Sequence, residues 1–373
     1  LIGSGSASFN GVSTEDNINC GASNNIIKSN TTTYVFWIKR TGTTKGYAMS
    51  GQRAGTNGSL LSVGINWSGA SSDDDGKITI VHWDGSNLLY NTTSSDVLDL
   101  NKWHHVAVVL TGSSQKIYVD GVKVLSGSNT FNVDSPGIGG ASEPFTIGAF
   151  NAGASTNLAC NIAQAAVYNE AMTQEKIQEI SQKQYSELTT SEKTNLTSWW
   201  GLDADISGAV EDLHGTESLG SELVDSNKAY IEYAGSGGLG GWSKHYFGTN
   251  TVTSNGDSVT IAYGNHTGGA RAYLRTTNLE HFLTSNLTAD KLYKFSCTVS
   301  DLVGSNIKFD LAGGYSSDAQ SNVITEGTNV FYIYATHVNS ISLQFTGFTT
   351  SNTLTLSNIS LKEVSGANHG AIF

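Results

Sequence analysis

The sequence has little proline, cysteine or charge. Of its 373 residues only 2 are proline and 3 are cysteine, and charged residues make up 14%, against about 25% in an average globular domain. Three cysteines are too few for a disulfide-stapled scaffold. No apolar run approaches the ~18 residues that a membrane-spanning helix needs, and no signal peptide is recognisable. These features argue against a disulfide-rich miniprotein and against a helical membrane protein.

The charge balance argues against nucleic acid as a partner. The chain carries 20 basic and 32 acidic residues, a net charge of −12, which repels a phosphate backbone and is compatible with divalent-cation sites. The first residue, Leu1, is not an initiator methionine. We therefore expect further residues upstream of it in the gene product.

What the chain has in abundance is glycine, with 42 residues, and Asn, Ser and Thr between short apolar runs. Its length predicts two domains, each able to bury a core. This composition is typical of β-rich extracellular or particle-surface proteins, and the recurring apolar runs exclude a disordered chain.

Residues 103–124 give the clearest local pattern. Apolar residues alternate with small or polar ones over 103–110 and again over 115–119, and Asp120-Gly121 predicts a two-residue hairpin into a third strand. His104 and His105 fall inside the first of these strands, so one should face the core and the other outward. We predict structural roles for both.

This WHHVAVVL…YVDG pattern resembles the laminin-G-like branch of the concanavalin-like lectin fold. The segments SASFNGVSTEDNINCG (6–21), TTTYVFWIKRTG (31–42) and CNIAQAAVYNEAMTQEKI (160–177) are similar to its opening, second and closing elements, in the expected order. Asn161 and Gln164 stand where the family usually has acidic residues. The resemblance implies a jelly roll that binds or assembles, since only some members of the fold catalyse.

The second half of the chain also predicts strands. Its layout, ending in LTLSNISLKEV, resembles the carbohydrate-binding-module-like jelly rolls of tailed-phage virion proteins. Helix signals are confined to the middle, where Thr173 and Thr189 can each cap a short helix. The adjacent Trp199 and Trp200 should pack against the first domain, because two exposed indoles would be costly. The second-half strands are expected at 228–233, 258–263, 270–275, 292–300, 306–311, 329–336, 340–346 and 353–362.

The predicted fold class is therefore all-β, with two β-sandwich jelly rolls joined by a short helical connector. The laminin-G-like domain is expected at 1–170, the helical and Trp-containing connector at 171–220, and the second β-sandwich at 221–373. Cys20 and Cys160 lie on strands that can be neighbours, so they form either a disulfide or a pair of buried thiols. Cys297 is expected to be a core thiol.

No catalytic frame is evident, and the chain is predicted not to be an enzyme. Glycosidases need two carboxyl groups at a fixed separation, and the Glu-x-Asp-x-x-Glu strand of the glucanases does not occur. Glu15-Asp16 and Glu211-Asp212 are adjacent pairs, whose side chains point to opposite faces of an extended strand. The alternative is a glycan hydrolase with an unrecognised site.

Calcium is the cofactor that the sequence favours. Asp73, Asp74 and Asp75 supply several oxygens in a short stretch, as hard cations require. The alternative is a solvated acidic turn. By analogy with related binding modules, Glu222 could share a structural calcium with Asn358 or Glu363.

Sugar binding requires exposed aromatic rings beside polar groups. Trp242 and Tyr246 lie in a glycine-flanked segment and are the first candidates, with Trp67 and Trp83 at strand ends as weaker ones. For each tryptophan the alternative is core packing.

These features together predict a virion-surface protein of a tailed bacteriophage, a fibre or a capsid decoration. Its partners would be host-surface glycans and other virion proteins, without nucleic acid or membrane insertion, and a homo-oligomer would give avidity. The alternative is a secreted bacterial adhesin or the polysaccharide-binding module of a larger enzyme.

Overall fold

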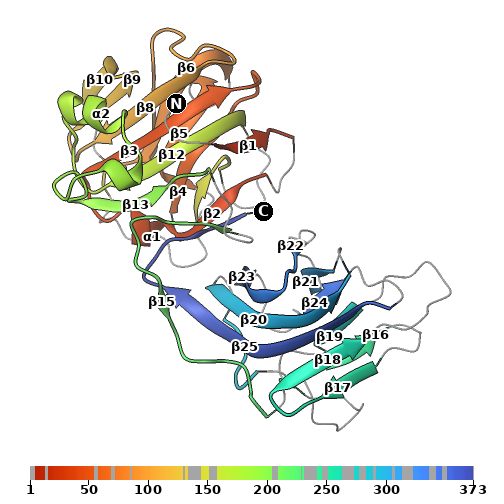
Figure 1. Cartoon of the computed structure of the whole chain (residues 1–373). Helices are drawn as coiled ribbons and strands as arrows, with labels where there is room; N and C mark the ends of the chain where they lie inside the picture. Colours follow the sequence, from red (N-terminus) through yellow and green to blue (C-terminus); the bar gives the residue numbers. More distant parts are fainter. Residues whose placement is uncertain are drawn as a thin grey trace. The chain divides into compact units, whose positions relative to one another are not determined.

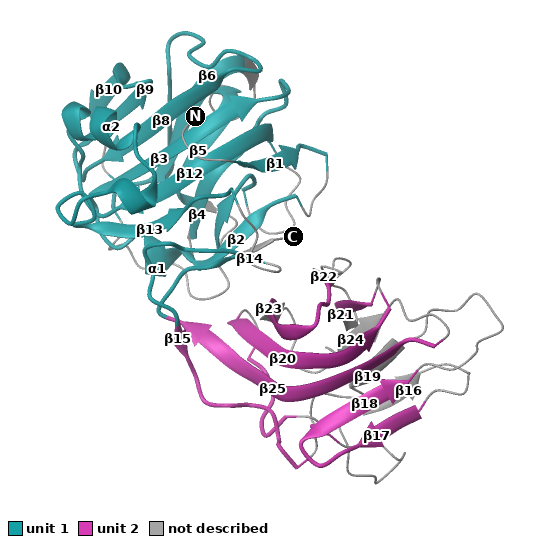
Figure 2. Cartoon of the chain, in the orientation of Figure 1, with its two compact units in different colours: residues 1–205, 209–217, 366–373 teal, residues 206–208, 218–365 magenta. Residues whose placement is uncertain are grey.

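The structure is a computed structural model, and its chain divides into two compact units (Figure 2). Unit 1 contains residues 1–205, 209–217 and 366–373, and unit 2 contains residues 206–208 and 218–365. The residues that the structure describes are 5–12, 16–53, 58–68, 72–84, 86–128, 131–132, 144–150, 158–203, 209–227, 229–230, 242–245, 251–262, 273–276, 283–288, 291–304, 307–312, 322–335, 342–346 and 351–372.

One layer of unit 1 is a seven-stranded antiparallel sheet (Figure 1). Its strands are β1 (Ala7–Asn10), β3 (Thr32–Arg40), β8 (Trp103–Leu110), β9 (Ser114–Val119), β10 (Val122–Ser128), β12 (Ala159–Tyr168) and β13 (Leu196–Trp200). They run in the order β1-β12-β3-β8-β9-β10, and β13 pairs with β12. Asp120 and Gly121 both have positive φ angles, 49° and 75°, which confirms the predicted hairpin.

The second layer of unit 1 is an eight-stranded sheet in the order β14-β26-β2-β11-β4-β5-β6-β7. The bounds are β2 (Ile18–Ala22), β4 (Gly46–Arg53), β5 (Gly58–Ser68), β6 (Ser72–Trp83), β7 (Leu88–Thr92), β11 (Pro144–Ile147), β14 (Ala209–Val210) and β26 (Gly370–Ile372). A four-residue helix, α1 (Ser23–Ile26), follows β2. Strand β4 had no counterpart in the sequence-based prediction, because GYAMSGQR lacks a clear apolar alternation.

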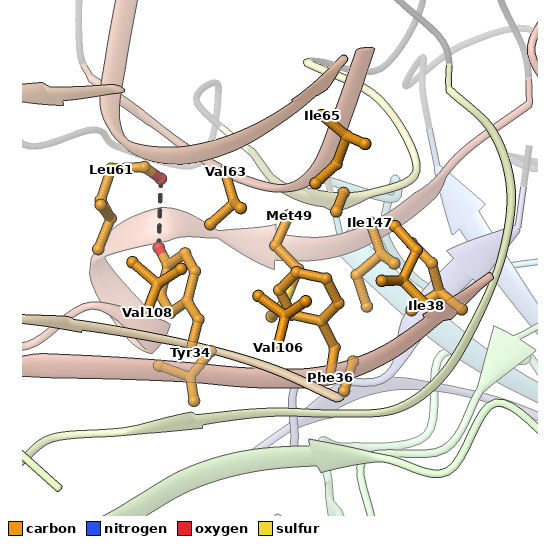
Figure 3. Packing of buried hydrophobic residues seen from close by; sticks show 14 of the residues in the cluster. Tyr34, Phe36, Ile38, Met49, Leu61, Val63, Ile65, Val106, Val108 and Ile147 are labelled. Atoms are coloured by element: carbon orange, nitrogen blue, oxygen red, sulfur yellow. Dashed lines mark hydrogen bonds between the residues drawn. The ribbon is translucent and has the colours of Figure 1, made fainter. Parts of the chain in front are cut away.

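The core of unit 1 lies between these two sheets (Figure 3). Tyr34, Phe36 and Ile38 alternate inward along β3 and are at most 1% exposed. Their neighbours from the other layer include Met49 and Val63. The Tyr34 hydroxyl donates a hydrogen bond to the carbonyl oxygen of Leu61 at 3.3 Å, so the polar atom of this buried ring has a partner.

The residues expected to form a connector belong largely to unit 1. Helix α2 (Gln174–Ile180) begins after Thr173, whose hydroxyl accepts a hydrogen bond from the backbone N–H of Lys176 at 3.3 Å, as predicted. A 3-10 helix follows at Tyr185–Glu187. The predicted second helix at Thr189 is wrong: Glu192 forms the expected capping contacts with Thr189, but residues 190–195 form only a turn.

Trp199 and Trp200 pack in unit 1, as predicted, but on opposite sides of its seven-stranded sheet. Trp200 is 0% exposed and lies in the sandwich core, where its ring stacks on that of Phe145 with centroids 5.7 Å apart. Trp199 is 2% exposed and packs on the outer face. Adjacent strand residues point to opposite faces of a sheet, so the two indoles anchor β13 on both faces of the seven-stranded sheet.

The last residues of the chain complete unit 1. Strand β26 lies between β14 and β2 in the eight-stranded sheet, so unit 2 is inserted in sequence between two paired strands of unit 1. Asp212, 1% exposed, accepts hydrogen bonds from the backbone N–H groups of Trp199 and Asn368 at 2.9 and 3.1 Å. This buried carboxylate ties the returning segment to β13.

Unit 2 contains a six-stranded and a five-stranded sheet. The six-stranded sheet consists of β15 (Ser218–Leu219), β17 (Thr251–Ser254), β18 (Ser258–Ala262), β20 (Lys291–Val303), β23 (Gly327–Ala335) and β25 (Thr353–Ser365). The five-stranded sheet consists of β16 (Trp242–His245), β19 (Tyr273–Thr276), β21 (Lys308–Ala312), β22 (Asn322–Val323) and β24 (Ser342–Thr346).

The core of unit 2 is centred on stacked phenylalanines. The ring of Phe309 lies 4.7 Å from that of Phe295 and 4.3 Å from that of Phe331, measured between centroids. The predicted strand at 228–233 is not formed where the structure describes it, since Ala229 and Tyr230 lie in a turn. The all-β prediction is confirmed for both units.

The three cysteines are buried free thiols, so Cys20 and Cys160 are not bridged. Burial raises the pKa of both thiols well above the ordinary value. Cys297 is a core thiol, as expected. Among the described residues, no helix is long and apolar enough to span a membrane.

Candidate functional site

The outer face of the seven-stranded sheet of unit 1, the face away from the sandwich core, has two different halves. The first, which we call the covered half, packs under helix α2 and the segment that follows it (Figure 1). Ile177 and Ile180 of α2 are 0% and 2% exposed there. The sheet residues of the covered half are Val35, Ala107, Val109, Tyr118, Ala166, Tyr168, Leu196 and Trp199.

A β-bulge in β12 marks the boundary between the halves. The register of β12 against β3 shifts between Ala163 and Ala166, and Gln164 has a φ of 49°. The side-chain oxygen of Gln164 accepts a hydrogen bond from the indole N–H of Trp199 at 2.9 Å. The bulge lets Ile162 and Val167 both face the core although they are five residues apart.

The second half, which we call the open half, consists of Ser8, Trp37, Lys39, Trp103 and Asn161. Ser8 is exposed, and the other four are partly exposed. Four of them form a row across neighbouring strands, because Ser8 is opposite Asn161, Asn161 is opposite Lys39, and Lys39 is opposite Trp103. Directly opposed side chains have Cβ atoms about 4.5–5.5 Å apart, so this row is continuous.

Trp37 lies next to that row on the same face. It is two residues before Lys39 on β3 and pairs with Ala163 on one side and His105 on the other. Its ring packs edge-on against the His105 ring, with centroids 5.5 Å apart. The Nζ of Lys39 lies 5.5 Å from the centroid of the Trp103 ring, within the range of a cation–π interaction.

Two histidines support the open half from β8, and both are buried. His104 lies between the carboxylate of Asp120, 2.8 Å from Nδ1, and the backbone N–H of Asp99, 3.1 Å from Nε2. Because that N–H donates to Nε2, the ring proton is on Nδ1 and is donated to Asp120. Burial lowers the pKa of His105 to about 4, so this ring is neutral near pH 7. The structural roles predicted for both fit this arrangement, but His105 does not reach solvent, because it is only 4% exposed.

The acidic stretch 73–75 forms the start of β6 instead of a loop. Asp75 pairs with the guanidinium of Arg40, which is 3% exposed. Arg40 also donates to the carbonyl oxygen of Leu98 and to the side-chain oxygen of Asn66, at 2.6 and 2.5 Å. Asp75 therefore serves as the counterion of a buried arginine. The side chains of Asp73 and Asp74 lie outside the described residues.

In unit 2 the predicted calcium ligands make hydrogen bonds within the fold. Glu222 accepts from the hydroxyl of Ser360 at 2.6 Å and from the backbone N–H of Leu361 at 2.8 Å, which fastens its segment to β25. The amide of Asn358 donates to the hydroxyl of Thr298 at 3.2 Å. Among the residues that the structure describes, no group of three His, Cys, Asp or Glu side chains could hold a metal ion.

The predicted aromatic platforms are not open ring faces where their side chains are described. Trp67 is only 9% exposed, packed against Tyr47 with ring centroids 4.8 Å apart. Trp83 is partly buried against the unit 1 core. Trp242 begins β16, which pairs with β19, but its side chain and all of Tyr246 lie outside the described residues.

The described residues of unit 2 also form a hollow with a volume of about 340 Å³. Hydroxyl and amide side chains line it, with Glu363 as the carboxylate and Tyr293 as the aromatic residue. Tyr293 is 1% exposed and its hydroxyl contacts Thr288, so it offers no ring face to a ligand. Glu363 lies 3.3 Å from Lys291. This hollow lacks the stacking surface that the open half has.

One protein-family model matches a large part of the first unit. Residues 12–178 match the family model of the concanavalin A-like lectin/glucanases superfamily, in its laminin-G-like branch. The first unit is a laminin-G-like jelly roll. The closing segment of this match contains β12 with Asn161, and its second strand contains Trp37 and Lys39, so most of the open half lies inside the matched region.

Solved structures similar to the chain include two proteins whose descriptions name a carbohydrate ligand or carbohydrate binding. A putative carbohydrate-binding protein from Bacteroides ovatus is 16% identical, with a TM-score of 0.43, over 57% of this chain and 56% of that one. Domain 4 of an extracellular arabinanase from Geobacillus stearothermophilus, solved with arabinotriose, is 16% identical, with a TM-score of 0.33, over 48% of this chain and 76% of that one.

A heptameric pentraxin from Limulus polyphemus is similar over 42% of this chain and 71% of its own, with 17% identity and a TM-score of 0.33. No curated protein sequence matches the chain.

Sequence reasoning did not single out the open half of the laminin-G-like unit. Trp37 and Trp103 were placed on strands, but their proximity depends on the register of β3 against β8. The available signal was that both occupy positions facing away from the core while being large and apolar. Such outward tryptophans need either a covering element or a ligand.

Proposed function

We propose that the chain is a non-catalytic carbohydrate-binding protein, and that the open half of its laminin-G-like unit is the glycan-binding surface. The observation that carries the proposal is the grouping of two partly exposed indoles with an amine, an amide and a hydroxyl on one sheet face. Sugar sites combine apolar ring surface with a few polar groups that fix orientation. The lectin-like fold of the unit supports the same function.

The carboxylates around the open half support a binding role over a hydrolytic one. Both oxygens of Asp120 are in use, one with His104 and the other with the backbone N–H of His105 at 2.8 Å. Asp99 contacts Lys102 at 3.0 Å. A glycosidase needs one carboxyl group to act as acid and a second as base or nucleophile, and these two carboxylates have other partners.

We further propose that the protein is displayed on the surface of a tailed phage, where several copies would present weak sites together. The order of a laminin-G-like unit, a Trp-bearing segment and a second β-sandwich unit supports this context. A secreted bacterial adhesin is the alternative. Electron microscopy with antibodies against the protein would label virions under the first proposal and bacterial surfaces under the second.

The binding proposal is tested by affinity electrophoresis on gels that contain a panel of neutral and acidic polysaccharides. We expect at least one gel to retard the protein, and Trp37→Ala to reduce that retardation about tenfold or more. Tyr90→Ala is the matched control, since it removes another exposed aromatic residue of the same unit, 37% exposed on β7. Retardation that Trp37→Ala leaves unchanged, or no retardation on any gel, would contradict the proposal.

A further inference from the structure

The open half carries a positive charge, that of the Lys39 ammonium group. Lys39 is partly buried between Asn161 and Trp103 in the sheet register. Among the described side chains it forms no ion pair, and its ammonium group rests over the Trp103 ring instead. In a protein with a net charge of −12, an ammonium group held in this way is a specific feature of this face.

The nearby acidic side chains do not neutralise Lys39. Asp120 accepts hydrogen bonds from the ring of His104 and from the backbone N–H of His105, and Asp99 is paired with Lys102. Lys102, which precedes Trp103, is 65% exposed and its charge is paired with that of Asp99. The attraction that an anionic ligand would meet on the open half therefore comes from Lys39.

The separation of the Trp37 and Lys39 positions matches the size of one sugar ring. Two residues along a strand are separated by about 6.6 Å, which is the distance between the Trp37 and Lys39 positions on β3. A pyranose ring over the indole of Trp37 can therefore direct a carboxylate substituent toward the ammonium of Lys39. The amide of Asn161, which donates to the Ser6 hydroxyl at 3.4 Å, and the hydroxyl of Ser8 lie beyond Lys39 in the same row.

We infer that the open half recognises a carboxylate-bearing saccharide, with its ring on Trp37 and its carboxylate on Lys39. In this arrangement Trp103 positions the ammonium, and Asn161 and Ser8 form hydrogen bonds with sugar hydroxyls. The inference rests on the proposed glycan-binding function and specifies its ligand class. A charge-assisted hydrogen bond in a partly buried site is stronger than a neutral one, which gives the preference for an acidic sugar.

The test compares acidic polysaccharides with their carboxyl-reduced forms, which keep the sugar rings and linkages. The probes are polygalacturonate, alginate, hyaluronan and polysialic acid, each with its reduced counterpart, measured by affinity electrophoresis at low and moderate salt. We expect at least one acidic form to bind about tenfold more tightly than its reduced form, a difference of about 1.4 kcal/mol. We expect added salt to narrow that difference.

Lys39→Met keeps most of the side-chain stem and removes the charge. It should abolish the preference for the acidic form while leaving binding of the reduced form within about twofold of the wild type. Lys123→Met, an exposed lysine on β10, is the matched control and should keep the preference. Equal wild-type binding of acidic and reduced forms, or a preference that survives in Lys39→Met, would overturn the inference and leave the proposed function intact. Absence of binding to every probe would overturn both.

Discussion

The covered and open halves of the outer sheet face are built on the same strands, yet they differ in what lies on them. Val35 and Trp37 are two residues apart on β3 and point the same way, but Val35 is 1% exposed while Trp37 reaches solvent. The difference comes from α2 and the segment that follows it, which cover one half of the face only. Burial against a helix explains the apolar residues of the covered half, and it leaves the indoles of the open half without a structural explanation.

This contrast separates stability from recognition. Side chains of the covered half contribute hydrophobic burial, so their loss should destabilise unit 1. Those of the open half are only partly removed from water, so their loss should affect ligand binding more than folding. Substitutions in the two halves should therefore differ in their effects on stability and on binding.

The largest effect is expected for Trp199→Ala in the covered half. It removes a fully buried indole and leaves the side-chain oxygen of Gln164 without its donor, which should cost about 4 kcal/mol of unfolding free energy. Trp37→Ala should cost about 1 kcal/mol, because its ring is already partly in water. Urea denaturation of the two variants measures both values, and equal costs would contradict the separation of the two halves.

The next largest effect is a pH dependence of the unfolding free energy that comes from His105, the buried ring beside Trp37. Burial lowers the pKa of His105 to about 4, below its ordinary value of 6.5. The unfolded chain therefore binds the proton first, and the stability that is present above pH 6.5 is lost as the pH falls toward 4, by about 3 kcal/mol. His105→Phe keeps an aromatic ring beside Trp37 and should lack this loss.

The measurement is the wild-type-minus-variant difference in unfolding free energy at pH 7 and at pH 4. Taking the difference is necessary because His82, whose pKa burial also lowers to about 4, remains in both proteins. A difference that does not change with pH would show that His105 is protonated as readily in the folded state as in the unfolded one.

A smaller effect is expected at the boundary between the halves. Gln164→Ala removes the acceptor of the Trp199 indole N–H and keeps a side chain at a φ of 49°, so it should cost about 1–2 kcal/mol. Gln164→Gly loses the same hydrogen bond but relieves the left-handed backbone, which offsets about 1 kcal/mol of that cost. If thermal unfolding finds the glycine variant less stable than the alanine variant, the bulge is not the strained position that the φ angle indicates.

The smallest effect on stability is expected for Ser8→Ala at the edge of the open half. Ser8 is exposed, so the unfolding free energy should stay within about 0.5 kcal/mol of the wild type. Loss of one hydrogen bond to a sugar should lower affinity about fivefold. Urea denaturation measures the unfolding free energy, and titration calorimetry with the tightest polysaccharide of the panel measures the affinity. An unchanged affinity would show that Ser8 is not part of the binding site.

The sequence predicted much of unit 1 because its local signals agree with the fold. Alternation identified the strands over 103–110 and 115–119, Asp120-Gly121 identified a hairpin, and Thr173 identified a helix start. Each of these signals depends on neighbours within a few residues. Strand β26 lacked such a signal, because GAI at the end of the chain is recognisable only through its pairing with β14 and β2.

The candidate site was harder to predict for the same reason. The open half depends on the register of four strands and on a bulge in β12, and the residue pattern around Gln164 does not predict that bulge. Asp75 illustrates the opposite error, since a run of acidic residues suggested a cation and the cation that pairs with Asp75 is Arg40, 35 positions away in the chain. Long-range pairing decides whether a carboxylate or an indole is available to a ligand, and local pattern does not.

The most direct test of the central claim is to follow the indole N–H signals of the seven tryptophans by ¹H–¹⁵N NMR while an acidic oligosaccharide is added. We expect the signals of Trp37 and Trp103 to shift together and saturably, while those of Trp199, Trp200 and Trp67 stay in place. Shifts confined to other tryptophans, with Trp37 and Trp103 unchanged at saturation, would contradict the central claim.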